Sequence, residues 1–215
     1  FSLWDGLQIS VSQAILLFLF VAGISHWLLE RSSRSLKIGL LALLFFVTLR
    51  SISFIQTNRQ QKLIVYNVPR QTAIDIISGR DYMFLGDSSL LANDLARNFH
   101  LKPSRVAHRV KQVSRIAEFN LYENYWSFRD MHILLLSTPV YFPPQEQKPV
   151  IDLLIISKNS ALNFKKLVAS LIIKQVVFDG SLPAWKIQSW EKDCNSLGIP
   201  CYDVTTKGAF VMKLR

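Results

Sequence analysis

Histidine, cysteine and glycine are scarce in this chain, and their spacing excludes several kinds of site. The 8 glycines are scattered, and none falls into the spacing of a P-loop or a dinucleotide-binding loop. The 2 cysteines are too few to form a structural zinc site. The serines of GDSS at 86–89 have no histidine and acid at recognisable spacing, so a turn and a helix N-cap are favoured over a nucleophile.

Acidic residues are also few, since 15 Asp and Glu stand against 25 Lys and Arg, which gives a formal charge of +10. A basic balance of this size favours an acidic partner such as nucleic acid or anionic lipid. A basic surface that only keeps the protein soluble is the alternative.

Charged side chains are absent from residues 9–29. A helix of about 20 apolar residues crosses the hydrocarbon core of a bilayer, so this run predicts a transmembrane helix. A second apolar run, 38–49, is flanked by Lys37 and Arg50, whose charged ends can reach the interface. We expect a second span at about 36–55, with a buried or interfacial helix as the alternative. Residues 1–58 would then be the end of a membrane domain.

The segment between the two runs is basic, because it contains Arg31, Arg34 and Lys37. The positive-inside rule places such a turn in the cytoplasm and the soluble domain, residues 60–215, outside it. A second basic cluster at Arg50, Arg59 and Lys62 opposes this orientation. Polar groups in the first run, among them His26, indicate packing against other helices. We therefore expect a multi-pass protein of the cell membrane, of which this chain is one piece. The expected partner of this piece is the missing amino-terminal part of the same protein, and assembly into a homo-oligomer is an alternative left open.

Strand periodicity dominates residues 63–89, where three short apolar runs are divided by PRQ at 69–71 and GRD at 79–81. A helix should follow, because Leu90, Leu91, Leu95 and Phe99 recur at helical spacing. Further strands are expected at 115–122, 132–137, 151–157, 175–178, 200–204 and 209–214, with helices at 163–172 and from 183 to near 198. This order predicts a soluble α/β domain after the membrane part.

Six basic residues and no acid lie between positions 97 and 115: Arg97, Lys102, Arg105, Arg109, Lys111 and Arg115. On a helix, Lys102, Arg105 and Arg109 would share one face and could contact phosphates of DNA. Tyr122, Tyr125, Trp126 and Phe128 could supply stacking surfaces for bases, or belong to the core. A solvated face, or one that rests on lipid phosphates, is the alternative.

Cys194 and Cys201 flank the junction between the last predicted helix and the next strand. If the domain lies outside the cytoplasm, a disulfide across this junction is feasible. Otherwise, both are small core residues.

Three segments together resemble the carboxyl end of the ComEC family of competence membrane proteins, which import DNA during natural transformation. They are LIVYNVPRQTAIDIISGRDYMFLGD, IDLLIISKNS and PAWKIQSWEKDCNSLGIPCYDVTTKGAFVMKL. In that family, the last helices of a competence domain lead into a metallo-β-lactamase-like domain. The resemblance implies that Asp87 stands where the family has the aspartate of a strand-end turn, and that residues 157–160 stand at the family's later histidine pair.

The chain departs from the family where the metal would be held. The family's His-x-His-x-Asp-His segment is not found between Asp87 and about residue 130. The positions that the resemblance assigns to the degenerate site are Asp87, Ser157, Lys158, Asn159, Ser160 and Asp179. A lysine ammonium would repel a cation.

We therefore expect an α/β, metallo-β-lactamase-like but degenerate domain with no catalytic residue, no metal and no cofactor. It would act in structure, DNA guidance or partner contact. A membrane-anchored metal-dependent nuclease with unrecognised ligands is one alternative, and a membrane-anchored scaffold with no nucleic-acid role is another.

Overall fold

The computed structural model describes residues 9–140, 142–143, 147–158 and 163–214, and the chain divides into two compact units. One unit contains the residues up to Gln60 together with Val106–Arg109, and the other contains Gln61–Arg105 and Val110–Arg215. Of the residues singled out above, Asn159 and Ser160 lie outside the described part.

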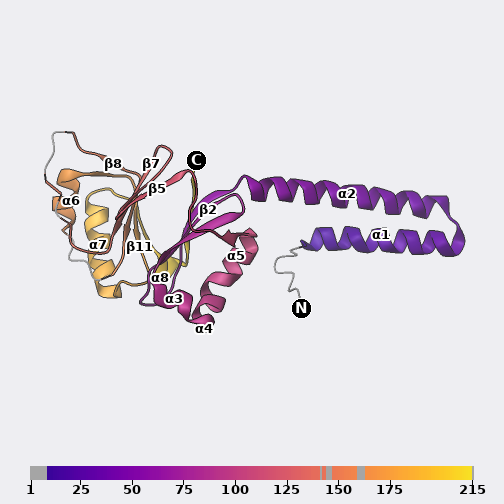
Figure 1. Ribbon diagram of the computed structural model, residues 1–215, viewed down its shortest axis with the longest axis horizontal. Helices are drawn as coiled ribbons and strands as arrows, with labels where there is room; N and C mark the ends of the chain where they lie inside the picture. The colour runs from indigo at the N-terminus through magenta and orange to yellow at the C-terminus, as the bar shows by residue number, and fades with distance from the viewer. Residues whose placement is uncertain (1–8, 141, 144–146, 159–162, 215) are drawn as a thin grey trace. The chain divides into compact units, whose positions relative to one another are not determined.

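The first unit is a helical hairpin of α1 (Val11–Glu30) and α2 (Ser33–Asn58) (Figure 1). Ser10 and Gln13 cap the start of α1 reciprocally. The helices approach closely at Gly23 and Gly39, since a Cβ on Gly23 would lie 2.9 Å from Gly39 Cα. His26 Nδ1 lies 3.0 Å from Ser35 Oγ of α2, so this histidine has a partner on the neighbouring helix. Both helices are long and apolar enough to cross a membrane.

The second unit contains two larger mixed sheets, which confirms the α/β class. Sheet A has the order β13-β1-β2-β3-β4 and sheet B the order β12-β11-β9-β7-β6-β5, while β8 and β10 form a small parallel pair. The strands of sheet A are β1 (Gln61–Val65), β2 (Ala73–Ser78), β3 (Asp81–Gly86), β4 (Lys111–Gln112) and β13 (Phe210–Lys213). Those of sheet B are β5 (Phe119–Tyr122), β6 (Tyr125–Phe128), β7 (Met131–Leu136), β9 (Leu153–Ile156), β11 (Val176–Phe178) and β12 (Cys201–Asp203). The small pair is β8 (Val150–Ile151) and β10 (Ile172–Ile173).

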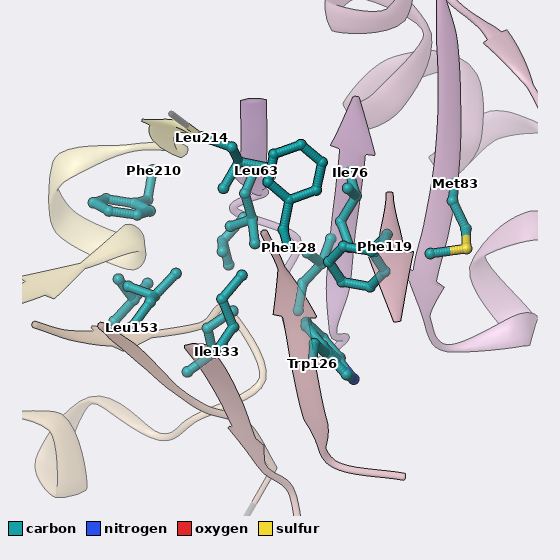
Figure 2. Close-up of a cluster of buried hydrophobic side chains, with 14 of the residues drawn as sticks. Leu63, Ile76, Met83, Phe119, Trp126, Phe128, Ile133, Leu153, Phe210 and Leu214 are labelled. Carbon is teal, nitrogen blue, oxygen red and sulfur yellow. The ribbon is translucent and has the colours of Figure 1, made fainter. Parts of the chain in front are cut away.

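The main core lies between sheets A and B. Figure 2 shows Leu63, Ile76 and Met83 of sheet A meeting Trp126, Ile133 and Leu153 of sheet B. Alternation along β2 and β6 puts every second side chain into this layer. Full burial of one such large side chain stabilises the fold by roughly 1.5–3 kcal/mol.

Helices cover the outer face of each sheet (Figure 1). Two further clusters of buried side chains lie there, so the layers run helix, sheet, sheet, helix. The side of sheet A carries α3 (Ser88–Ala92), α4 (Asp94–Ala96), the π-helical turn η1 (Arg97–Leu101) and α5 (Lys102–His108). The side of sheet B carries α6 (Phe164–Ser170) and α7 (Ala184–Ser196), and α8 (Val204–Lys207) follows β12.

The sequence patterns located most of these elements, and three of the differences have a clear cause or consequence. The apolar run 151–157 is two strands, because Asp152 interrupts it and accepts hydrogen bonds from His132 N and Lys174 Nζ. The hairpin strand β6 was not predicted. The helix after Ser89 breaks at Asn93, which ends α3 and caps α4. Leu90 is therefore buried, whereas Leu95 and Phe99 are exposed, so helical spacing across the break was misleading.

Candidate functional site at the strand ends

Six polar residues gather where strand ends of the two sheets meet. Sheet A contributes Thr72, just before β2, and Asp87, just after β3. Sheet B contributes side chains that follow the parallel strands β9 and β11, and in such sheets these carboxyl ends are the usual location of binding sites. We call this group the strand-end cluster: Thr72, Asp87, Ser157, Lys158, Asp179 and Ser181.

Asp179 is the buried acid of the cluster. Its Oδ2 accepts a hydrogen bond of 2.7 Å from the hydroxyl of Thr72, and its Oδ1 accepts one of 3.0 Å from the backbone N–H of Ser181. The Ser181 hydroxyl also donates to Oδ1. Burial, followed by the negative charge of Asp87, raises the pKa of Asp179 to about 6, although its hydrogen bonds act in the opposite direction.

Asp87 is the more exposed acid, and it pairs with a cation. Its Oδ1 lies 3.1 Å from Lys158 Nζ, and its Oδ2 accepts a hydrogen bond of 3.0 Å from Thr72 N–H. Partial burial acts to raise the pKa of Asp87, but the Thr72 N–H and the Lys158 ammonium outweigh it and hold the pKa below its usual value. The structure thus brings together Asp87, Lys158 and Asp179, three of the positions that the family resemblance assigns to one degenerate site.

Backbone contacts close the edge of the sheets beside this cluster. The N–H of Arg70 donates to the carbonyl oxygen of Gly180 over 2.8 Å. A Cβ on Gly180 would lie 2.4 Å from the carbonyl oxygen of Val68. The loop after β11 therefore packs directly on the loop between β1 and β2, and only glycine fits there.

The side chains of the strand-end cluster do not fit a divalent metal ion as ligands. One carboxylate is neutralised by a lysine ammonium, and the oxygens of the other accept hydroxyl and amide hydrogens. Among the described residues, no three His, Cys, Asp or Glu side chains could hold an ion together. His132 lies against Tyr125, His100 against Phe99 in η1, and His108 at the end of α5.

Ser157 has a fully buried hydroxyl that makes no hydrogen bond within the described part of the chain. It follows β9 directly and adjoins Lys158. A buried unpaired hydroxyl costs free energy, roughly 1–3 kcal/mol, so an ordered water is the simplest partner.

Arg105 does not lie on an exposed basic face, contrary to the sequence interpretation. It is buried, and its Nε and a terminal nitrogen bind the two carboxylate oxygens of Asp75 at 2.8 and 2.9 Å. Its guanidinium also stacks 4.2 Å from the ring centroid of Tyr82. The lone carboxylate in the apolar strand β2 was a readable signal, because a fully buried Asp75 requires a partner.

The other five basic residues are dispersed. Arg97 pairs with Asp94 at 2.6 Å, and Arg109 follows the end of α5 and is half-buried. Lys102, Lys111 and Arg115 are exposed. They lie on α5, on β4 and in the segment before β5, and therefore do not form a stripe along one helix.

The aromatic candidates separate in the same way. Trp126 and Phe128 belong to the core between the sheets, whereas Tyr122 and Tyr125 are exposed.

Cys194 of α7 and Cys201 of β12 are free thiols. Burial, followed by the neighbouring Cys201, raises the pKa of Cys194 to about 12, which suppresses the reactive thiolate.

Comparison with known families identifies the second unit. The sequence model of the ComEC C-terminal domain matches residues 63–214, nearly the whole of the second unit. The chain belongs to the ComEC family. No curated protein and no solved structure matches it. ComEC proteins are membrane proteins, in keeping with two helices long enough to span, and membership suggests involvement in DNA uptake for competence.

Proposed function

We propose that this chain is the carboxyl-terminal portion of a ComEC-type DNA-uptake protein whose soluble domain is not catalytic. Residues 1–58 form the end of the membrane domain, and residues 60–215 form a degenerate metallo-β-lactamase-like domain. That domain acts in structure, DNA guidance and contact with the rest of the same protein. The helix–sheet–sheet–helix order of layers is consistent with a fold of this type.

The observation that carries the non-catalytic role is the pair formed by Lys158 and Asp87. In a metallohydrolase, the carboxylates at this edge would neutralise a divalent ion and its activated water. Here a side-chain ammonium supplies the positive charge, and it has neither an open coordination position nor a bound water whose pKa it could lower. The hydroxyl and amide donors on Asp179 complete a network that ties sheet A to sheet B.

DNA guidance is supported by the exposed cations of the same unit. Lys102, Lys111 and Arg115 are exposed, and no acidic partner lies within ion-pair distance of them among the described residues. Cations of this kind neutralise backbone phosphates without reading sequence, which suits a protein that handles DNA of any sequence. Arg105 is not part of this surface, because Asp75 occupies its guanidinium.

The test is the salt dependence of DNA binding by the detergent-solubilised chain. Substituting Lys102→Gln, Lys111→Gln and Arg115→Gln together should weaken binding of a fluorescent oligonucleotide. The slope of log affinity against log salt should fall by about 2 for single strands, since each lost phosphate contact removes about 0.7. A control of equal chemistry, Lys166→Gln with Lys192→Gln, uses exposed lysines of α6 and α7 and should leave the slope unchanged.

Unchanged affinity and slope in the triple variant would refute DNA guidance by these residues. Hydrolysis of DNA by the purified chain, dependent on added Mn²⁺ or Zn²⁺ and abolished by a chelator, would instead establish the nuclease alternative. DNA binding absent from the unsubstituted chain would leave a membrane-anchored scaffold.

A further inference from the structure

Two apolar side chains of the second unit, on neighbouring helical turns, are largely exposed. Leu95 of α4 is 84% exposed and Phe99 of η1 is 78% exposed. These values match those of side chains on the candidate membrane helix α1, where Leu29 is 85% and Val11 79% exposed. Neither residue is needed for the core beneath it, which Leu90 and Leu101 fill.

The local structure holds both side chains outward. The side chain of Asn93 accepts a hydrogen bond of 3.2 Å from Ala96 N–H and starts α4 one residue before Leu95. Leu101 is fully buried and anchors the other end. Between them, Arg97–Leu101 form a π-helical turn, a less stable form that occurs often at functional sites. Leu95 and Phe99 therefore project from a fixed helical segment.

The charges around the two side chains fit a lipid surface. Lys102 is exposed on the next turn, and the only acid in the helical segment 94–108, Asp94, is paired with Arg97. Leucine and phenylalanine beside lysine is the composition of helices that lie in a membrane interface, where apolar groups enter the acyl boundary and cations meet anionic headgroups.

The chain itself keeps this segment near a bilayer. The candidate span α2 ends at Asn58, and β1 begins at Gln61. A connection this short holds the second unit at a high effective concentration next to the membrane that α2 enters. Even a weak lipid-binding surface would be occupied under this condition.

We propose that the segment 93–102 is a membrane-docking surface, in which Leu95 and Phe99 insert into the headgroup region of an anionic bilayer beside Lys102. This surface goes beyond DNA guidance and uses side chains that DNA binding does not need. It fixes which side of the domain faces the membrane.

An environment-sensitive dye on the full chain in nanodiscs tests the proposal. A nitrobenzoxadiazole label would be attached at Phe99→Cys in a Cys194→Ala, Cys201→Ala background whose urea midpoint verifies folding. Its emission should shift to shorter wavelength in nanodiscs that contain phosphatidylglycerol, and brominated lipids should quench it. The same label at Trp185→Cys, an exposed position of α7, should show neither effect.

Three outcomes would overturn the proposal. In the first, the dye emission at position 99 equals that at position 185 in every lipid. In the second, the emission at position 99 responds to added single-stranded DNA but not to lipid. In the third, it depends on protein concentration, which would indicate contact with a second copy of the chain. A second variant separates failure of membrane docking from failure of DNA guidance. In Leu95→Ser with Phe99→Ser, the dye is attached at Asn98→Cys, and brominated lipids should no longer quench it. The salt slope of DNA binding by the same variant should stay unchanged.

Discussion

At the scale of single residues, the buried carboxyl group of Asp179 makes the stability of the fold depend on pH. The pKa of Asp179 is raised to about 6, above the 3.8 typical of an aspartate in water. Between these values, the folded chain holds a proton that the unfolded chain has lost. Stability therefore falls as pH rises from about 4 to 6, by roughly 3 kcal/mol at most, at 1.36 kcal/mol per pKa unit.

Asp179→Asn should remove this penalty. The amide can still accept from Ser181 N–H, and the Thr72 hydroxyl can reverse its role to accept from the amide. We expect the variant, relative to the unsubstituted chain, to gain about 1–3 kcal/mol between pH 4 and pH 7, measured by urea unfolding of the detergent-solubilised chain. Asp87→Asn is the contrasting control, because the lowered pKa of Asp87 gives stability that is lost as pH falls. A difference for Asp179→Asn that does not vary with pH would contradict the assignment.

The chemistry of single residues also explains which members of the strand-end cluster could be predicted from the sequence and which could not. Asp87, Lys158 and Asp179 were placed together by resemblance, and they are together. Thr72 and Ser181 were missed, because hydroxyl residues are common and nothing in their own sequence context marks them as partners. Arg105 was assigned to DNA because its buried partner Asp75 is 30 positions away in the sequence.

At the scale of elements, the loop after β11 and the loop between β1 and β2 form the joint between the two sheets. Gly180 and Val68 touch through backbone atoms, and the Arg70 N–H to Gly180 carbonyl bond spans the joint. A backbone contact cannot yield as a flexible side chain can, so added volume must move a whole loop.

Gly180→Ala should therefore destabilise the second unit, by about 1–3 kcal/mol as for other overpacked sites. Its Cβ would lie 2.4 Å from the Val68 carbonyl oxygen. Gly198→Asn is the matched control, since that glycine has φ +67° and open space around it, and asparagine tolerates this conformation. Urea midpoints of both variants measure the effect. Equal, small losses would show that the joint adapts without cost.

The order of elements was largely predictable, whereas their pairing was not. Periodicity and turn residues located β1, β2, β3, β7, β11 and α7 within a few residues. The last strand, β13, pairs with β1, although the two strands lie at opposite ends of the second unit's sequence. No local pattern encodes such a pairing, because it depends on which apolar faces meet when the layers assemble.

At the scale of the whole molecule, basic residues near the ends of the two candidate spans predict the side of the membrane on which the second unit lies. Arg31, just after α1, and Arg34 and Lys37, near the start of α2, predict a cytoplasmic turn and an extracytoplasmic domain. Arg50, Arg59 and Lys62 oppose this orientation from the other end of α2. The first cluster flanks the short turn between the two apolar helices, whereas the second cluster precedes a whole domain, and the rule applies most directly to short loops.

Reporter fusions should decide the orientation. We expect alkaline phosphatase joined after residue 215 to be active in intact cells, and green fluorescent protein at the same position to be dark. Fusions after residue 32, between the two candidate spans, should behave in the opposite way and serve as the internal control. The reverse pattern would place the domain in the cytoplasm, where a disulfide between Cys194 and Cys201 is not expected.

The sequence by itself determined the two apolar helices, the α/β class and the family, since each depends on local composition, periodicity or the order of motifs. Only the tertiary structure decided that Lys158 neutralises Asp87, that Arg105 is buried against Asp75, and that Leu95 and Phe99 remain exposed. The reason is physical: the charge state and exposure of a side chain depend on the groups that folding brings near it, and those groups come from distant parts of the chain.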